Sequence, residues 1–313
     1  MKGLELSQKY YEEYGKEMIH SQFPELESVI AVGLVGSGSE CLGYDDDISK
    51  DHDFEPGFCI FIPDNADIDD RTIFKLERAY AKLPNEFHGF KRQKMSPVGG
   101  NRHGVMRAGD FYESKTGRRD GNLSLSDWLS IPEHYLLEAT NGKVFRDDEG
   151  SFSEIRARLM QMPEDVRIKK LAGNLLLMAQ SGQYNFMRCV SHGESGAAQL
   201  ALSEFVNSTM ACAFLLGGRY MPFYKWRFRA LRELPLLSGV ASSLEQLLTT
   251  PNTPETANEK QFIIEEIASQ IITVLNERRI TKAICGDLEK HAYSVNDCIK
   301  DNNLRNAGIL YGV

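Results

Sequence analysis

The chain has 313 residues, of which 42% are hydrophobic and 26% are charged, and its formal net charge is −8. This length favours two domains, because single hydrophobic cores seldom grow beyond about 250 to 300 residues. The negative charge argues against an extended nucleic-acid-binding surface, which needs clustered Lys and Arg, so nucleic acid is not an expected partner.

Targeting and metal-binding signals are also missing from the sequence. The six cysteines show no CxxC pairing, and the segment after Met1 has no apolar signal-peptide core. The most apolar stretch, residues 210–216, is far shorter than the roughly 20 residues that span a bilayer. We therefore expect a reduced, cytoplasmic protein that does not cross a membrane and has no structural zinc site.

The first half of the chain alternates helical and strand patterns. Apolar residues at three- and four-residue spacings predict a helix over 4–20, and stretches rich in Val, Ile, Leu and Phe predict strands over 28–35 and 57–62. A helix is expected over 68–83. Residues 84–120 predict only one strand, near Val105, and short helices at 127–129 and 133–139 precede a turn at Asn141-Gly142.

From residue 151 the pattern becomes helical. Long apolar periodicities predict helices over 153–160, 164–179, 197–216, 242–248, 260–275 and 280–292. The expected fold is α+β, with an N-terminal domain of residues 1–150 built on a small mixed sheet and an all-α helical-bundle domain of residues 151–313.

A Gly/Ser loop, Gly36-Ser37-Gly38-Ser39, follows the first strand, and Asp51-His52-Asp53 precedes the second. Glycines let backbone N–H groups approach a polyphosphate, and a serine hydroxyl adds a donor. Two carboxylates flanking one residue of a strand point to the same side, so Asp51 and Asp53 can share Mg²⁺ while His52 faces away. A solvated acidic turn is the simpler interpretation of Asp45, Asp46 and Asp47.

The order of these elements resembles the signature of the polymerase-beta-like nucleotidyltransferase superfamily. In this order a strand is followed by Gly-Ser, then by eleven residues, and then by Asp-x-Asp at the start of the next strand. Four segments resemble an uncharacterised bacterial nucleotidyltransferase-like family, a domain of unknown function. They are GSGSECLGYDDDISKDHDF at 36–54, DWL at 127–129, LLEATNGKVF at 136–145 and RYMPFYKW at 219–226. The resemblance spans most of the chain, and the layout is similar to kanamycin nucleotidyltransferase. It implies that Gly38 and Ser39 form the phosphate loop and that Asp51 and Asp53 bind the metal.

The general base is not assigned by this resemblance. Many superfamily members have a third acidic residue on a later strand, but near Val105 this chain has Met106 and Arg107, and Asp110 comes only after them. Glu194 and Glu204 of the helical domain are further candidates, as the resemblance to antibiotic-modifying enzymes allows.

Cations and aromatic residues alternate in the segment 219–226. Arg219 and Lys225 suit a triphosphate, and the aromatic rings between them suit stacking on a base. We expect Lys225 to contact the leaving group from the helical domain. In the structural alternative, Pro222 ends the preceding helix and the aromatic residues pack beneath it.

These residues lead to an expected magnesium-dependent enzyme. It would move a nucleoside monophosphate, AMP by expectation, from a nucleoside triphosphate such as ATP to a hydroxyl of a small molecule and release pyrophosphate. The alternatives are an inert nucleotide-binding module of the same fold, or a transferase that acts on a protein or tRNA. A metal phosphohydrolase built on His52 and Asp53 is disfavoured, because that chemistry needs further histidines. The acceptor and the oligomeric state are not determined by the sequence.

Overall fold

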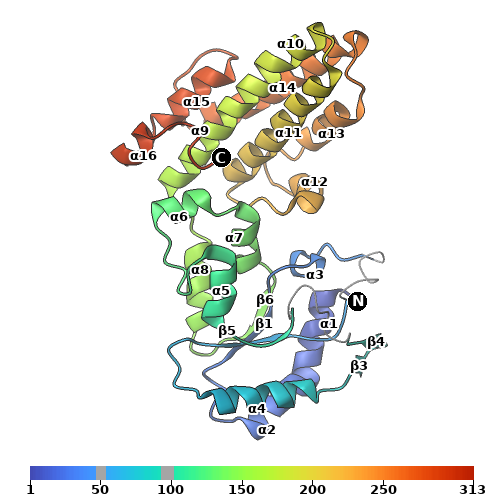
Figure 1. The fold of residues 1–313 in the computed structure, drawn as a ribbon, viewed down its shortest axis with the longest axis vertical. Helices are drawn as coiled ribbons and strands as arrows, with labels where there is room; N and C mark the ends of the chain where they lie inside the picture. The colour runs from blue at the N-terminus through green and yellow to red at the C-terminus, as the bar shows by residue number, and fades with distance from the viewer. Residues whose placement is uncertain (47–53, 93–101) are drawn as a thin grey trace. The chain divides into compact units, whose positions relative to one another are not determined.

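The structure is a computed structural model that describes residues 1–46, 54–92 and 102–313 (Figure 1). The fold is α+β, as the sequence predicts. The chain divides into two compact units, the first formed by residues 1–124 and 135–161 and the second by residues 125–134 and 162–313.

The expected boundary at residue 150 lies inside the first unit. Helix α8 (Ser151–Leu159) follows that boundary, yet its Phe152 is buried and stacks on Phe61 of the sheet with ring centroids 4.2 Å apart. The hydroxyl of Tyr112 also donates to the carbonyl of Phe152 at 2.8 Å. This aromatic packing makes α8 part of the core of the first unit.

The first unit contains a four-stranded mixed sheet with the strand order β5-β2-β1-β6. Its strands are β1 (Ala31–Leu34), β2 (Cys59–Ile62), β5 (Gly104–Arg107) and β6 (Lys143–Arg146). Strand β1 is antiparallel to β2 and β6, whereas β2 is parallel to β5. The strand expected near Val105 is confirmed. A two-residue hairpin, β3 (Glu86–Phe87) with β4 (Phe90–Lys91), lies outside this sheet.

Glycine at position 33 permits close pairing of β1 with β6. A Cβ there would lie 2.6 Å from the carbonyl oxygen of Lys143. The β1–β6 register also shifts between Val32 and Gly33. Sequence periodicity did not reveal β6, because it is a short, half-exposed strand with little room for an alternating pattern.

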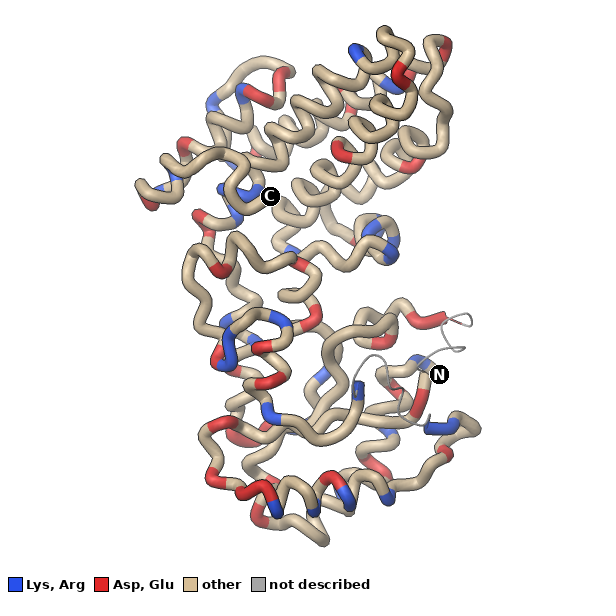
Figure 2. The backbone as a smooth tube through the Cα atoms, in the orientation of Figure 1, with Lys and Arg blue, Asp and Glu red and all other residues tan. Residues whose placement is uncertain are grey.

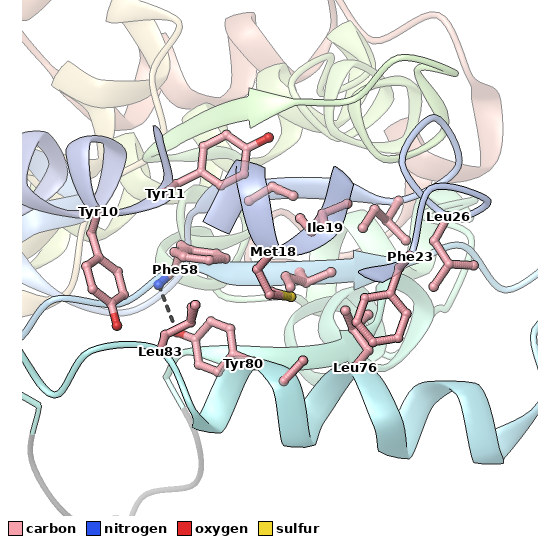
Figure 3. Packing of buried hydrophobic residues seen from close by; sticks show 14 of the residues in the cluster. Tyr10, Tyr11, Met18, Ile19, Phe23, Leu26, Phe58, Leu76, Tyr80 and Leu83 are labelled. Atoms are coloured by element: carbon pink, nitrogen blue, oxygen red, sulfur yellow. Dashed lines mark hydrogen bonds between the residues drawn. The ribbon is translucent and has the colours of Figure 1, made fainter. Parts of the chain in front are cut away.

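Helices cover the sheet of the first unit. They are α1 (Gly3–Tyr10), η1 (Tyr11–Gly15), α2 (Lys16–Gln22), α3 (Ser39–Leu42), α4 (Asp70–Ala81), α5 (Ala108–Thr116), α7 (Glu133–Thr140) and α8. Aromatic and aliphatic residues of α1, η1, α2 and α4 pack with Phe58, Ile60 and Ile62 in one core cluster, and the hydroxyl of Tyr80 accepts the Phe58 backbone N–H at 3.0 Å (Figure 3). Helix α5 was not expected, because its apolar periodicity is weak.

The second unit is helical. It contains α6 (Leu125–Ser130), α9 (Glu164–Met178), η3 (Ala179–Asn185), α10 (Phe186–Ser191), α11 (Ser195–Gly217), η4 (Tyr224–Trp226), α12 (Arg227–Arg232), α13 (Val240–Thr249), α14 (Pro254–Glu277), α15 (Leu288–Asn296) and α16 (Asn302–Asn306). The helix expected over 280–292 begins only at Leu288, because the Asp287 side chain caps it by accepting the Glu289 N–H at 2.9 Å.

Helix α11 confirms the helix expected over 197–216, and it is apolar over most of its length. Its 23 residues make it long and apolar enough to cross a membrane by length and composition, so the expectation of a much shorter apolar segment is wrong. However, 67% of its most apolar window is buried within the protein. A buried core helix of a bundle has this composition as well.

Candidate functional site

The Gly/Ser loop connects β1 to α3 in the first unit. Gly36 and Gly38 have φ values of +102° and +132°, in the range that favours glycine. Space is limited as well, since a Cβ on Gly38 would lie 1.9 Å from Nη2 of Arg102. The positive φ at position 38 therefore requires glycine, whereas the limited space comes from the movable side-chain ends of Arg102 and Glu40.

Asn141 holds the start of this loop through two backbone hydrogen bonds. The Gly36 N–H donates to Oδ1 of Asn141 at 2.8 Å, and Nδ2 of Asn141 donates to the Gly36 carbonyl at 2.8 Å. Both groups are buried. The asparagine expected only to form a turn thus satisfies a buried peptide unit 105 residues away in sequence.

Two cations contact the loop, each with a carboxylate partner. Nη2 of Arg102 donates to the Ser37 carbonyl at 2.6 Å and forms an ion pair with Glu40. Nζ of Lys115 donates to Ser37 Oγ at 3.2 Å and to Glu138 at 2.5 Å, and Ser37 Oγ in turn donates to Glu138 at 2.8 Å.

Sequence reasoning missed Arg102 and Lys115, because their approach depends on β5 and α5 rather than on a local motif. The signal for Glu138 and Asn141 lay in the segment LLEATNGKVF.

The charges beside the loop balance in pairs, Arg102 with Glu40 and Lys115 with Glu138. The two pairs leave no excess positive charge for a bound triphosphate. Such a ligand would need a further cation, and magnesium that binds together with the nucleotide is one.

Burial raises the pKa of the Cys41 thiol well above its ordinary value and that of Cys59 to about 12. Both thiols stay protonated at neutral pH, which makes them poor metal ligands and nucleophiles.

The expected metal ligands, Asp51 and Asp53, lie outside the described residues, together with Lys50 and His52. Strand β2 begins at Cys59, two residues later than expected. In the described ranges there is no group of three or more His, Cys, Asp or Glu side chains that could hold a metal ion.

The acidic run before these residues is not a fully solvated turn. Asp45 is buried at 3% exposure, and its Oδ2 accepts the Gly3 N–H at 2.8 Å. Asp46, in contrast, is exposed. Asp45 therefore anchors the N-terminal helix instead of facing water.

Asp110 is paired within the first unit. Its carboxylate binds Arg119, which also contacts Asp64 at 2.8 Å and Glu113 at 3.2 Å. Strand β5 carries no acidic residue, as the sequence indicates.

Glu194 and Glu204 are exposed residues of the second unit, Glu194 as the N-cap of α11 and Glu204 within that helix. Glu194 precedes the helix, whereas Arg219 follows its last turn. At 1.5 Å per residue these two positions are separated by roughly 35 Å, so Glu194 cannot share a site with the segment 219–226. Glu204 lies roughly 20 Å from the C-terminal end of the helix by the same count, and it accepts a hydrogen bond from Ser208 at 3.4 Å.

Two of the aromatic residues of the segment 219–226, Phe223 and Tyr224, do not pack beneath α11. The helix ends at Gly217 with Gly218 as its left-handed cap, well before Pro222. Phe223 and Tyr224 are 43% and 68% exposed, and Lys225 is exposed with Nζ 5.1 Å from the Trp226 ring. Arg219 is exposed too. The structural alternative for this segment is therefore wrong for these two rings.

Glu133 is a carboxylate of the second unit that sequence analysis did not single out. Its Oε2 accepts the Met221 N–H at 3.1 Å, which ties the segment 219–226 to the start of α7. Burial raises the pKa of Glu133, although Lys170 and Arg227 oppose the shift. A glutamate in the first turn of a helix is common, so its position alone carried no signal.

Comparison with known proteins gives one match. Residues 128–227 match the model of a family described as a domain of unknown function (DUF4037). The matched stretch contains Glu133, Glu138, Asn141 and Lys225, but not the Gly36–Ser39 loop. No curated protein and no solved structure matches the chain.

Proposed function

We propose that the protein is a magnesium-dependent nucleotidyltransferase of the polymerase-beta-like superfamily. The observation that carries the proposal is the Gly36–Ser39 loop, which follows a buried strand, is held by Asn141 and is flanked by Arg102 and Lys115. Asp51 and Asp53, which follow the loop in sequence, would hold Mg²⁺ with the nucleotide phosphates.

The proposed reaction is attack by an acceptor hydroxyl oxygen on the α-phosphorus of a nucleoside triphosphate. The new P–O bond joins the nucleoside monophosphate to the acceptor, and the bond to the β-phosphate breaks to release pyrophosphate. Mg²⁺ stabilises the charge that develops on the leaving group. The hydroxyl proton passes to a base that we do not assign. We take the nucleotide to be ATP and the acceptor to be a small molecule.

The test is nucleotide binding by calorimetry with and without Mg²⁺. We expect binding by the native protein to weaken greatly without the metal and in Asp51→Asn and Asp53→Asn. The exposed Asp67→Asn is a matched control, because it removes the same charge from the same unit. Equal, metal-independent binding by all four proteins would refute the site, and release of only orthophosphate from labelled triphosphate would refute the reaction.

A second candidate is an inert nucleotide-binding module of the same fold. The absence of an acidic residue on β5 and the pairing of Asp110 with Arg119 favour it. Magnesium-dependent binding without pyrophosphate release, tested with hydroxylated metabolites as acceptors, would select this alternative.

A further inference from the structure

Glu138 accepts the single hydroxyl proton of Ser37. Ser37 Oγ donates to Oε2 of Glu138 at 2.8 Å and accepts from Nζ of Lys115 at 3.2 Å. Nζ of Lys115 donates to the same Oε2 at 2.5 Å. One carboxylate oxygen of Glu138 therefore receives hydrogen bonds from two side chains at the Gly/Ser loop.

Three elements of the first unit bring these side chains together. Ser37 follows β1, Lys115 lies in the last turn of α5 and Glu138 lies on α7. The side chains of Lys115 and Glu138 are 15% and 19% exposed, and Nζ of Lys115 lies 5.9 Å from the centre of the Tyr135 ring. Water and salt screen such a partly buried pair less than an exposed one. Because Ser37 itself is exposed, a ligand in solution can still reach this arrangement.

A phosphate oxygen would use the same donors as Oε2 of Glu138. Ionised carboxylates and phosphates only accept hydrogen bonds, and both favour ammonium and hydroxyl donors. Glycine at positions 36 and 38 leaves the adjacent backbone without Cβ atoms, which suits a polyphosphate. The charge of the carboxylate also repels a phosphate. Glu138 and a phosphate group are therefore competing partners of Ser37 and Lys115.

We propose that Glu138 is an internal competitor of the nucleotide, because it holds the donors of Ser37 and Lys115 until a phosphate group displaces it. On displacement, Nζ of Lys115 and Oγ of Ser37 donate to phosphate oxygens instead of Oε2 of Glu138. Lys115 is then a phosphate ligand, and Glu138 sets the ligand concentration at which the loop is filled. That the displacing phosphate belongs to a nucleoside triphosphate rests on the proposed function.

A purely structural Glu138 makes the opposite prediction. If the carboxylate only held Ser37 and Lys115 in position, its loss would weaken phosphate binding. If it competes, its loss strengthens phosphate binding, although the protein loses an ion pair and becomes less stable. The sign of the change in affinity therefore separates the two roles.

The test measures binding of magnesium ATP and of magnesium tripolyphosphate to the full chain by calorimetry. Glu138→Gln keeps the length of the side chain and removes its charge, so the donors are held less tightly. We expect both ligands to bind about tenfold more tightly, which is about 1.4 kcal/mol, while the melting temperature falls. Lys115→Met should weaken binding about tenfold, and Lys115→Arg should retain most of it, because arginine keeps the positive charge.

Basic and acidic positions are mixed along α5 and the turn after it (Figure 2), so this helix offers a matched control. Glu113 of α5 is exposed and pairs with Arg119 at 3.2 Å. Glu113→Gln removes the same charge from the same unit and should leave the affinity for both ligands unchanged. Tighter binding by Glu113→Gln as well would assign the effect to net charge and overturn the inference.

Equal or weaker binding by Glu138→Gln than by the native protein would also overturn the inference, as would equal binding by Lys115→Met or no binding of either ligand. These outcomes are separate from catalysis. Tighter binding by Glu138→Gln without release of pyrophosphate retains the competition and removes only the proposed transfer. Release of pyrophosphate with unchanged affinity in Glu138→Gln retains the transfer and removes the competition.

Discussion

Replacing Asn141 with alanine should release the start of the Gly/Ser loop. The side chain of Asn141 is the partner of both the N–H and the carbonyl of Gly36, each at 2.8 Å, and it is 9% exposed. Alanine offers neither an acceptor nor a donor. The peptide groups of Gly36 must then remain unpaired or the loop must move until water reaches them.

The expected magnitude follows from these two bonds. A buried donor or acceptor left without a partner costs about 1 to 3 kcal/mol, so the loss of both bonds should lower the free energy of unfolding by about 2 to 4 kcal/mol, since water recovers part of the loss. That is a large share of a total stability of about 5 to 15 kcal/mol.

Chemical denaturation measures the stability, and hydrogen exchange of the Gly36 amide measures the local release. Asn122→Ala is the control, because Asn122 is exposed and its amide group bonds only to neighbours at the surface. That control should change the free energy of unfolding by less than about 0.5 kcal/mol. A similar small change in Asn141→Ala, with unchanged exchange at Gly36, would show that Asn141 does not hold the loop.

Two further predictions concern the second unit. Lys225→Met tests the expectation that this exposed lysine acts in catalysis: if it does, the transfer rate should fall about a hundredfold, the usual effect of losing a transition-state contact. The free energy of unfolding should change by less than about 1 kcal/mol, because among the described residues the amine of Lys225 is paired with the Trp226 ring. An unchanged rate would remove Lys225 from catalysis. Burial raises the folded-state pKa of Glu133 above its ordinary value of 4.5. Between the unfolded-state and the folded-state pKa, the folded state therefore binds more protons than the unfolded state. The contribution of Glu133 to stability falls as the pH rises through this range. The stability of Glu133→Gln relative to the native protein, measured by denaturation from pH 4 to 8, should therefore increase with pH, and a pH-independent difference would contradict the raised pKa.

The sequence by itself determined the helical second half and the positions of β1 and β2. Helices were predicted from the periodicity over 164–179 and 197–216, and a buried strand from the apolar run over 28–35. These patterns lie within each segment, so they can be recognised without knowledge of distant residues. The Gly/Ser loop was also readable, because positive φ values at Gly36 and Gly38 are a local requirement that selects glycine.

Only the tertiary structure brought Arg102, Lys115, Glu138 and Asn141 to that loop. These residues lie between 65 and 105 positions from the loop residues they contact. Their spacing in sequence follows from the lengths of intervening helices and strands, not from a local pattern. Lys169 and Lys260 are the same case in the second unit, because only the packing shows which distant oxygen atoms accept from their amines.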